Sequence, residues 1–285
     1  MGDGNGWARC DRGHTHWGRY GAAGLLAYHR TADGKVHVLL QQRAWWGSGG
    51  GTWGLFGGGR HRREDPLTAA LRETVEECTL DLTLARVHGF SADDHGGGWS
   101  FTTVVASISE LQEVWPASAE TRDAAWVPVD EVAAMPLFPP FAQTWERLRA
   151  ALVRPVLVVD AANVMGSRPD GWWRDRAGAA ARLRDQLALL VTAGVSGLPA
   201  GMFPYDRCFP EVTLVVEGAA RDVGAADSGV RVVPAQGIGD DAIVGLLGEP
   251  GAAYLVVTAD RELRARCADK GAVITGPRWL LDRLR

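Results

Sequence analysis

Apolar positions in the first half of the chain form short runs that are interrupted by turn residues, with one amphipathic segment between them. The runs that are typical of strands cover residues 21–28, 36–42, 82–88, 101–109 and 124–129. Between residues 66 and 77 the apolar positions instead recur at helical spacing, Asp65 can cap the segment, and Pro66 suits a first helical turn. A second helix is expected near residues 141–152. The pattern predicts a mixed α/β domain.

The pattern changes at Arg154-Pro155. Beyond it, short apolar runs alternate with amphipathic segments. Strands are expected at residues 156–160, 212–217, 230–234, 253–258 and 272–275, and helices at residues 177–191, 240–247, 261–270 and 277–284. Such an alternation is typical of a mainly parallel sheet covered by helices. We therefore expect two α/β domains, at residues 1–152 and 153–285.

Composition supports two globular domains and excludes several classes. The 285 residues are 46% apolar and 22% charged, and no uninterrupted apolar run reaches the roughly 18 residues of a membrane span. The N-terminus lacks the order of a signal peptide, so a cytoplasmic location is expected. The four cysteines form no C-x-x-C pair, which favours free thiols. With a net charge of -4, neither half is a strongly basic nucleic-acid binder.

Carboxylates recur at constrained spacing between residues 58 and 80. The segment reads Gly58, five residues, Glu64, seven residues, and then Arg72, Glu73, two residues, Glu76 and Glu77. The last three glutamates share one helical face and repel each other unless a cation lies among them. Carboxylate oxygens favour Mg²⁺ or Mn²⁺, which neutralises a pyrophosphate and activates water. A solvated acidic face is the alternative, but the fixed spacing favours a metal site.

This segment resembles the Nudix box, and the similarity covers roughly residues 17–150. The resemblance implies hydrolysis of a pyrophosphate bond in a nucleoside diphosphate derivative, which includes nucleotides and RNA 5′ ends. It also implies that Arg72 orients the carboxylates and that the Gly57 carbonyl completes the metal shell. Trp53 is a candidate for stacking on a base, although tryptophans more often pack in cores. Glu120 is a candidate for a further ligand, base or substrate contact.

The box departs from the family pattern at three positions. Phe56 stands where a proline is usual, and Arg63 and Thr79 stand where many members have glycine. A glycine at position 79 would adopt the left-handed conformation after the helix, which costs a threonine about 1 kcal/mol. The end of the helix is therefore expected to differ from the family pattern.

Cys10, His14 and His16 have the spacing of metal ligands near the N-terminus. Zinc normally takes four ligands, and the sequence does not show a fourth. A polar loop is the favoured interpretation, and metal binding stays open.

The second half places acids after several strands. Asp160 ends the first strand with Asn163 three residues later, Glu217 ends the next, and Asp240 and Asp260 stand at helix starts. The carboxyl ends of parallel strands meet at one edge, where such acids can hold Mg²⁺. Alternatively, Asp240 and Asp260 are helix caps.

This arrangement resembles the NYN branch of PIN-like nucleases and implies a metal-dependent endoribonuclease with a Rossmann-like fold. Glu217 replaces the expected aspartate and would reach a metal ion with a longer side chain. Arg168, Arg174 and Arg176 are candidate phosphate contacts. A non-catalytic RNA-binding or dimerisation module is the alternative, and a homodimer stays open.

The combined expectation is a Nudix α/β/α sandwich with a mixed sheet, followed by a Rossmann-like PIN/NYN domain. Catalytic roles are expected for Arg72, the three box glutamates, Asp160, Asp240 and Asp260. If both domains act on RNA, the first would shorten the 5′ phosphate group and the second would then cut the strand.

Overall fold

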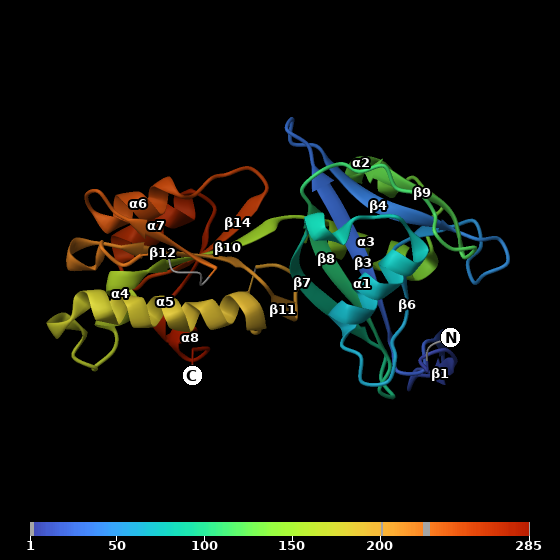
Figure 1. Ribbon diagram of the computed structural model, residues 1–285, viewed down its shortest axis with the longest axis horizontal. Coiled ribbons are helices and arrows are strands. Elements are labelled where there is room, and N and C mark those ends of the chain that lie inside the picture. Colours follow the sequence, from blue (N-terminus) through green and yellow to red (C-terminus); the bar gives the residue numbers. More distant parts are fainter. Residues whose placement is uncertain (1–2, 201, 225–228, 285) are drawn as a thin grey trace. The chain divides into compact units, whose positions relative to one another are not determined.

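The chain forms two compact units in a computed structural model that describes residues 3–200, 202–224 and 229–284 (Figure 1). The first unit comprises Met1–Leu152 together with Pro204–Asp206. The second comprises Val153–Phe203 and Arg207–Arg285. No helix in the described ranges is long and apolar enough to cross a bilayer.

A mixed sheet forms the centre of the first unit. Its central path runs β7-β8-β3-β4-β5, with β6 paired to β3 and β9 paired to β4. The bounds are β3 (Ala22–Arg30), β4 (Val36–Arg43), β5 (Trp53–Gly54), β6 (Phe56–Gly59), β7 (Ala85–Asp94), β8 (Ser100–Ile108) and β9 (Thr121–Pro128). β3 and β8 are parallel, whereas the other pairs along this path and its two branches are antiparallel. The expected mixed sheet is therefore confirmed.

Helix α1 (Pro66–Glu77) packs on one face of this sheet. The predicted start is confirmed, because the Asp65 side chain accepts a hydrogen bond from the Thr68 amide at 3.0 Å and Pro66 lies in the first turn. Ala69 and Ala70 are fully buried and belong to the same core as alternate residues of β3. Two further helices are α2 (Val129–Val132) and α3 (Pro139–Arg149).

Five parallel strands form the sheet of the second unit, in the order β13-β12-β10-β14-β15. They are β10 (Arg154–Asp160), β12 (Glu211–Val216), β13 (Val230–Pro234), β14 (Ala252–Val257) and β15 (Val273–Thr275). This is the strand order of a doubly wound sheet. From β10 the chain adds strands first on one side and then, from β14 on, on the other, so the order reverses between β10 and β14. The expected parallel sheet is present.

Helices pack against two apolar cores of the second unit. They are α4 (Ala161–Gly166), α5 (Arg176–Ala193), α6 (Gly239–Gly245), α7 (Arg261–Asp269) and α8 (Pro277–Leu281). Leu157 and Val159 of β10 belong to the core that includes α5, whereas Val156 and Val158 belong to the core that includes α7. Because alternate residues of a strand point to opposite faces, helices cover both faces of the sheet.

Some elements differ from the sequence expectation. Leu82–Leu84 is a short 3₁₀ turn capped by Asp81 and not the start of a strand, which begins at Ala85. The brief return of Pro204–Asp206 to the first unit was not expected. There the Asp206 amide donates to the Phe90 carbonyl at 2.9 Å, and its carboxylate accepts from the Ala92 amide at 2.7 Å. The edge of β7 is therefore covered by a segment distant in sequence.

Further short elements were also absent from the expectation. The hairpin of β1 (Trp7–Arg9) and β2 (Thr15–Trp17) precedes the main sheet, and β11 (Arg207–Cys208) bridges to Val195. Elements of two or three residues carry too little periodicity to be seen in a sequence.

Candidate active site

The three box glutamates lie on α1 in unequal environments. Glu77 is buried with 7% of its surface exposed, Glu73 is partly buried, and the Glu76 side chain is 58% exposed. Burial raises the pKa of Glu73, against the opposing effect of Arg72. The three carboxylates therefore lie at different depths on one helical face.

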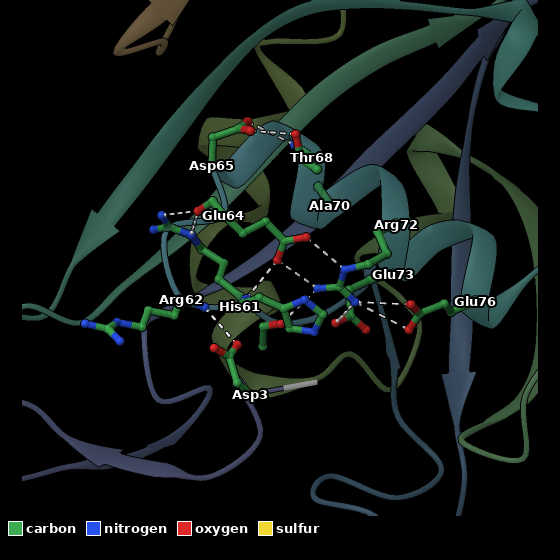
Figure 2. A network of polar contacts seen from close by, with 12 residues as sticks. Asp3, His61, Arg62, Glu64, Asp65, Thr68, Ala70, Arg72, Glu73 and Glu76 are labelled. Atoms are coloured by element: carbon green, nitrogen blue, oxygen red, sulfur yellow. Dashed lines mark hydrogen bonds and ion pairs between the residues drawn. The ribbon is translucent and has the colours of Figure 1, made fainter. Parts of the chain in front are cut away.

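Arg72 links the carboxylates into one network (Figure 2). Its guanidinium donates to both carboxylate oxygens of Glu64, at 2.9 and 3.0 Å, and to Glu73 at 2.7 Å. It also lies 3.4 Å from both Glu76 oxygens and donates to the Gly59 carbonyl at 3.1 Å. Hydrogen bonds from Arg72 lower the pKa of Glu64. The planar guanidinium contacts all three carboxylates and a backbone carbonyl, and it therefore fixes the orientation of Glu64 and Glu73.

Glu77 is held by two hydrogen bonds that end on the same oxygen. The Gln41 amide donates to its Oε2 at 2.9 Å, and the Gly57 backbone N–H donates at 3.1 Å. Gln41 is fully buried and also accepts from Thr121 at 2.8 Å, so its own orientation is fixed. Burial, together with the charges of Glu73 and Glu120, raises the pKa of Glu77 to about 7.

Gln41 is a positioning residue that sequence reasoning missed. The available signal was a glutamine within the apolar run of β4. A buried amide in a strand needs hydrogen-bond partners, and here one of them is a box glutamate.

The glycines before α1 allow β6 to lie close to its neighbours. A Cβ on Gly57 would meet the Ala23 carbonyl oxygen at 2.3 Å, and one on Gly58 would meet the Glu73 carboxylate at 2.4 Å. The backbone of β6 therefore lies against the carboxylates of α1. This closeness is compatible with the expected role of the Gly57 carbonyl.

The two candidate substrate residues lie in different settings. Glu120 is exposed, yet its charge contributes to the raised pKa of both Glu73 and Glu77. Trp53 is half-buried in β5, with its backbone bonded to Pro136 and Phe138. Glu120 thus lies in the electrostatic environment of the carboxylates, and its role stays a prediction.

Two of the three departures from the box can be followed in the local backbone. Arg63 has a φ of 67°, the left-handed conformation that glycine adopts most easily. Thr79 is not left-handed, because the chain leaves α1 in an extended conformation at Cys78. Instead, the Thr79 amide donates to the Trp115 carbonyl at 3.0 Å, and the Trp115 amide donates to the Thr79 hydroxyl at 2.9 Å. The helix therefore ends without a left-handed residue.

The acids of the second unit gather at the carboxyl edge of its sheet. Asp160 is buried at the end of β10, where the Asn163 side chain donates to it at 2.7 Å and Thr258 at 2.9 Å. Glu217 follows β12 and accepts from the Gly239 amide at 3.0 Å. Burial and the charges of Asp260, Asp160 and Glu217 raise the pKa of Asp240.

The helix-cap alternative holds for only one of the two aspartates. Asp260 caps α7 by accepting from the Leu263 amide at 2.8 Å. Asp240 lies in the first turn of α6, which begins after Ile238 and has no side-chain cap. A cap therefore does not account for Asp240.

The first unit combines a mixed sheet with a helix that carries an arginine-linked carboxylate face, and this combination defines a Nudix-type domain. The NUDIX domain family matches residues 21–148. A Mycobacterium tuberculosis protein called "Putative 8-oxo-dGTP diphosphatase 3" is 46% identical over 159 residues, covering 53% of this chain and 71% of that protein. The chain belongs to the Nudix family and is a hydrolase.

Two further relatives match a similar share of the chain. A Bifidobacterium longum nucleoside triphosphate pyrophosphatase/Nudix hydrolase fusion protein is 39% identical over 153 residues, which are 52% of this chain and 32% of that protein. The crystal structure of the Mycobacterium smegmatis Nudix hydrolase RenU is 40% identical, covering 51% of this chain and 93% of that one, with a TM-score of 0.48.

Proposed function

We propose that the first unit hydrolyses a pyrophosphate bond in a nucleoside diphosphate derivative, with a divalent metal ion held by Glu73, Glu76 and Glu77. The observation that carries the proposal is the buried Glu77, whose pKa is raised to about 7 beside two further carboxylates. Three acids on one face with a single arginine among them are stabilised by a cation.

The donor set fits a hard divalent ion. Carboxylate oxygens and a backbone carbonyl, as at Gly57, are ligands that Mg²⁺ and Mn²⁺ accept. Such an ion, when bound, neutralises the pyrophosphate and lowers the pKa of a water molecule. The chain contributes the orientation: Arg72 fixes Glu73 through a 2.7 Å contact, and Gln41 fixes Glu77 through a 2.9 Å contact. Glu120 is proposed to contact the metal or substrate.

The substrate panel begins with 8-oxo-dGTP, because a relative that is 46% identical carries that substrate in its name. Ordinary nucleoside triphosphates, dinucleotides, nucleotide sugars and RNA 5′ ends complete the panel. Trp53 is the proposed base contact, and Trp53→Ala is expected to raise KM more than it lowers kcat.

The test compares Glu77→Gln with Glu146→Gln, an exposed glutamate of α3, in Mg²⁺ and Mn²⁺. Losing a ligand charge without a change of shape should lower kcat by at least about 10²-fold. The Glu146 variant should keep wild-type turnover. Wild-type turnover in Glu77→Gln on the best substrate would refute the assignment.

A second function is favoured by the acids of the second unit. We propose a PIN/NYN-type domain, within residues 153–285, in which Asp160, Asp240, Asp260 and Glu217 hold Mg²⁺ or Mn²⁺ for phosphodiester cleavage of RNA. The raised pKa of Asp240, caused by burial and by the other three acids, supports it. Asn163 supports Asp160 through its 2.7 Å hydrogen bond and is the proposed substrate contact.

Asp240→Asn tests this second function, with Asp269→Asn, an exposed residue of α7, as its control. Cleavage of single-stranded RNA should fall by at least about 10²-fold in the first variant only. If the wild type does not cleave RNA but still hydrolyses nucleotides, the alternative of a non-catalytic RNA-binding or dimerisation module is favoured.

The two proposed activities can act in sequence on one RNA. With a 5′-triphosphorylated oligonucleotide, Glu77→Gln should leave the RNA largely uncut, and Asp160→Asn should accumulate full-length monophosphorylated RNA. Equal cutting of triphosphorylated and monophosphorylated RNA by the wild type would show that the sites are independent.

A further inference from the structure

Four side chains outside the carboxylate site have the composition of a zinc site. One ligand atom from each of Cys10, His14, His16 and His95 lies within 4.8 Å of every other. The first three belong to the β1–β2 hairpin and its turn, and His95 belongs to the turn between β7 and β8. The fourth ligand that the sequence did not reveal is therefore supplied by a distant segment of the same unit.

Two of these imidazoles have a buried ring nitrogen that lacks a hydrogen-bond partner among the described residues. The atoms are Nε2 of His16 and Nδ1 of His95. Leaving a buried polar atom unsatisfied costs about 1–3 kcal/mol, and two such atoms in one cluster are unusual. A ligand that accepts an electron pair from each nitrogen would remove both costs.

The surrounding structure positions the turn at Cys10 and the His16 ring without using those nitrogen atoms. Gly13, with a φ of 81°, allows the tight turn in which the Cys10 amide donates to the His14 carbonyl at 3.0 Å. The His16 ring stacks on Trp99 with 3.9 Å between ring centroids. Trp99 is fixed by donating from its indole to the Gly18 carbonyl at 2.8 Å. The His16 ring is thus oriented by packing.

Aromatic packing alone is the competing explanation. It accounts for the stacking of His16 on Trp99, but it does not account for the unpartnered nitrogen atoms or for the nearby Cys10 thiol, which is buried. One thiolate and three imidazoles are ligands that suit zinc, whereas Mg²⁺ prefers oxygen.

We propose that Cys10, His14, His16 and His95 bind one zinc ion in a closed, tetrahedral structural site that is separate from the glutamates of α1. Four protein ligands leave no position open for a substrate, so the ion would act by cross-linking. It would join the β1–β2 hairpin to the β7–β8 turn, next to the existing 3.1 Å hydrogen bond from Arg12 to the Asp94 carbonyl.

The anchored segment also contacts the loop before α1. The Asp3 carboxylate accepts from the Arg62 amide of that loop at 3.0 Å. Within the segment, the Arg19 amide donates to the Gly4 carbonyl at 2.9 Å, which joins the end of the hairpin to the residues next to Asp3. Figure 2 shows the contact between Asp3 and Arg62. Binding zinc should therefore raise the Tm of the full chain and slow proteolysis within residues 3–19.

The first measurement is made on the full-length wild type. After chelation and reconstitution we expect one tightly bound zinc per chain. With Co²⁺ in its place, we expect the visible bands of a tetrahedral ion and a thiolate charge-transfer band. Cobalt bound without the thiolate band, or no tight zinc, would overturn the proposal without any variant.

Variants then identify the ligands. Cys10→Ser and His95→Gln should each weaken zinc binding by about 10²-fold or more, because one of four ligands is lost. Asp11→Asn, an exposed neighbour in the same turn, and Cys208→Ser, a buried thiol of the second unit, serve as controls. Glu77→Gln should also retain zinc. Zinc binding that is unchanged in His95→Gln, or lost in Glu77→Gln, would contradict the assignment.

Discussion

Burial of a single carboxylate determines how the candidate active site responds to pH. Glu77 keeps 7% of its surface exposed, and its pKa is raised to about 7. An unfolded glutamate has a pKa of about 4.3, so between these values the folded chain holds a proton that the unfolded chain has lost. The free energy of unfolding therefore falls as pH rises through this window and stays lower above it.

The first prediction concerns the metal-free protein. Its free energy of unfolding should fall between about pH 4 and pH 7, by up to roughly 3 kcal/mol from Glu77 alone. Glu77→Gln should lack this component, since both hydrogen bonds to Glu77 end on one oxygen that a glutamine carbonyl can replace. Urea unfolding of both proteins across pH isolates the difference, because the other titrating groups cancel. Parallel pH curves would contradict the raised pKa.

The placement of the box residues was predictable because it depends on spacing along one helix. Glu73, Glu76 and Glu77 share a face of α1, and Arg72 precedes Glu76 by four residues, a spacing at which any helix brings two side chains together. Gln41 was not predictable, since its contact with Glu77 depends on how β4 packs beside α1. His95 was missed for the same reason, because only the fold brings it to Cys10.

At the scale of elements, β6 shows how two adjacent glycines can have different functions. A Cβ on Gly57 would collide with the backbone of β3, whereas a Cβ on Gly58 would meet the end of the flexible Glu73 side chain. A backbone cannot yield as a side chain can. The first glycine is therefore required by the sheet and the second by the carboxylates.

The second prediction follows from this difference. Gly57→Ala should destabilise the protein by several kcal/mol, because the strand must shift. Gly58→Ala should leave Tm within a few degrees of the wild type but lower the pyrophosphohydrolase kcat, because Glu73 is displaced. Thermal unfolding and kinetics of both variants provide the test. Equal loss of stability in the two variants would contradict it.

Element prediction succeeded where periodicity was long or the flanking signals were strong. The bounds of α1 follow from Asp65, Pro66 and an apolar stripe, and the central strands follow from buried runs. The six-residue α4 has less than two turns of periodicity, and Leu82–Leu84 has apolar residues that a 3₁₀ turn accepts equally well. Such short segments take their conformation from tertiary packing.

At the scale of the whole molecule, residues 204–206 belong to a unit from which they are distant in sequence. Asp206 pairs with Phe90 and Ala92 on β7, and the Tyr205 hydroxyl donates to the Ala151 carbonyl at 2.8 Å. The amide hydrogens of an unpaired strand edge exchange with water faster than those of a covered edge.

The third prediction tests this segment. Asp206→Ala should remove the acceptor of the Ala92 amide and speed its hydrogen exchange, at a cost of about 1 kcal/mol to the first unit. Asp222→Ala, which replaces an exposed residue of the second unit, should leave the exchange rate of the Ala92 amide unchanged. Hydrogen exchange resolved to β7 measures both. Unchanged exchange in Asp206→Ala would show that the contact contributes nothing.

The return of residues 204–206 also affects how the protein is made. During synthesis all of Met1–Leu152 is translated before Asp206 exists, so a first unit that folds during translation has the edge of β7 uncovered. In that interval the second unit still lacks β12, β13, β14 and β15. The final hydrogen bonds of the N-terminal enzyme are therefore formed only after more than fifty further residues have been translated.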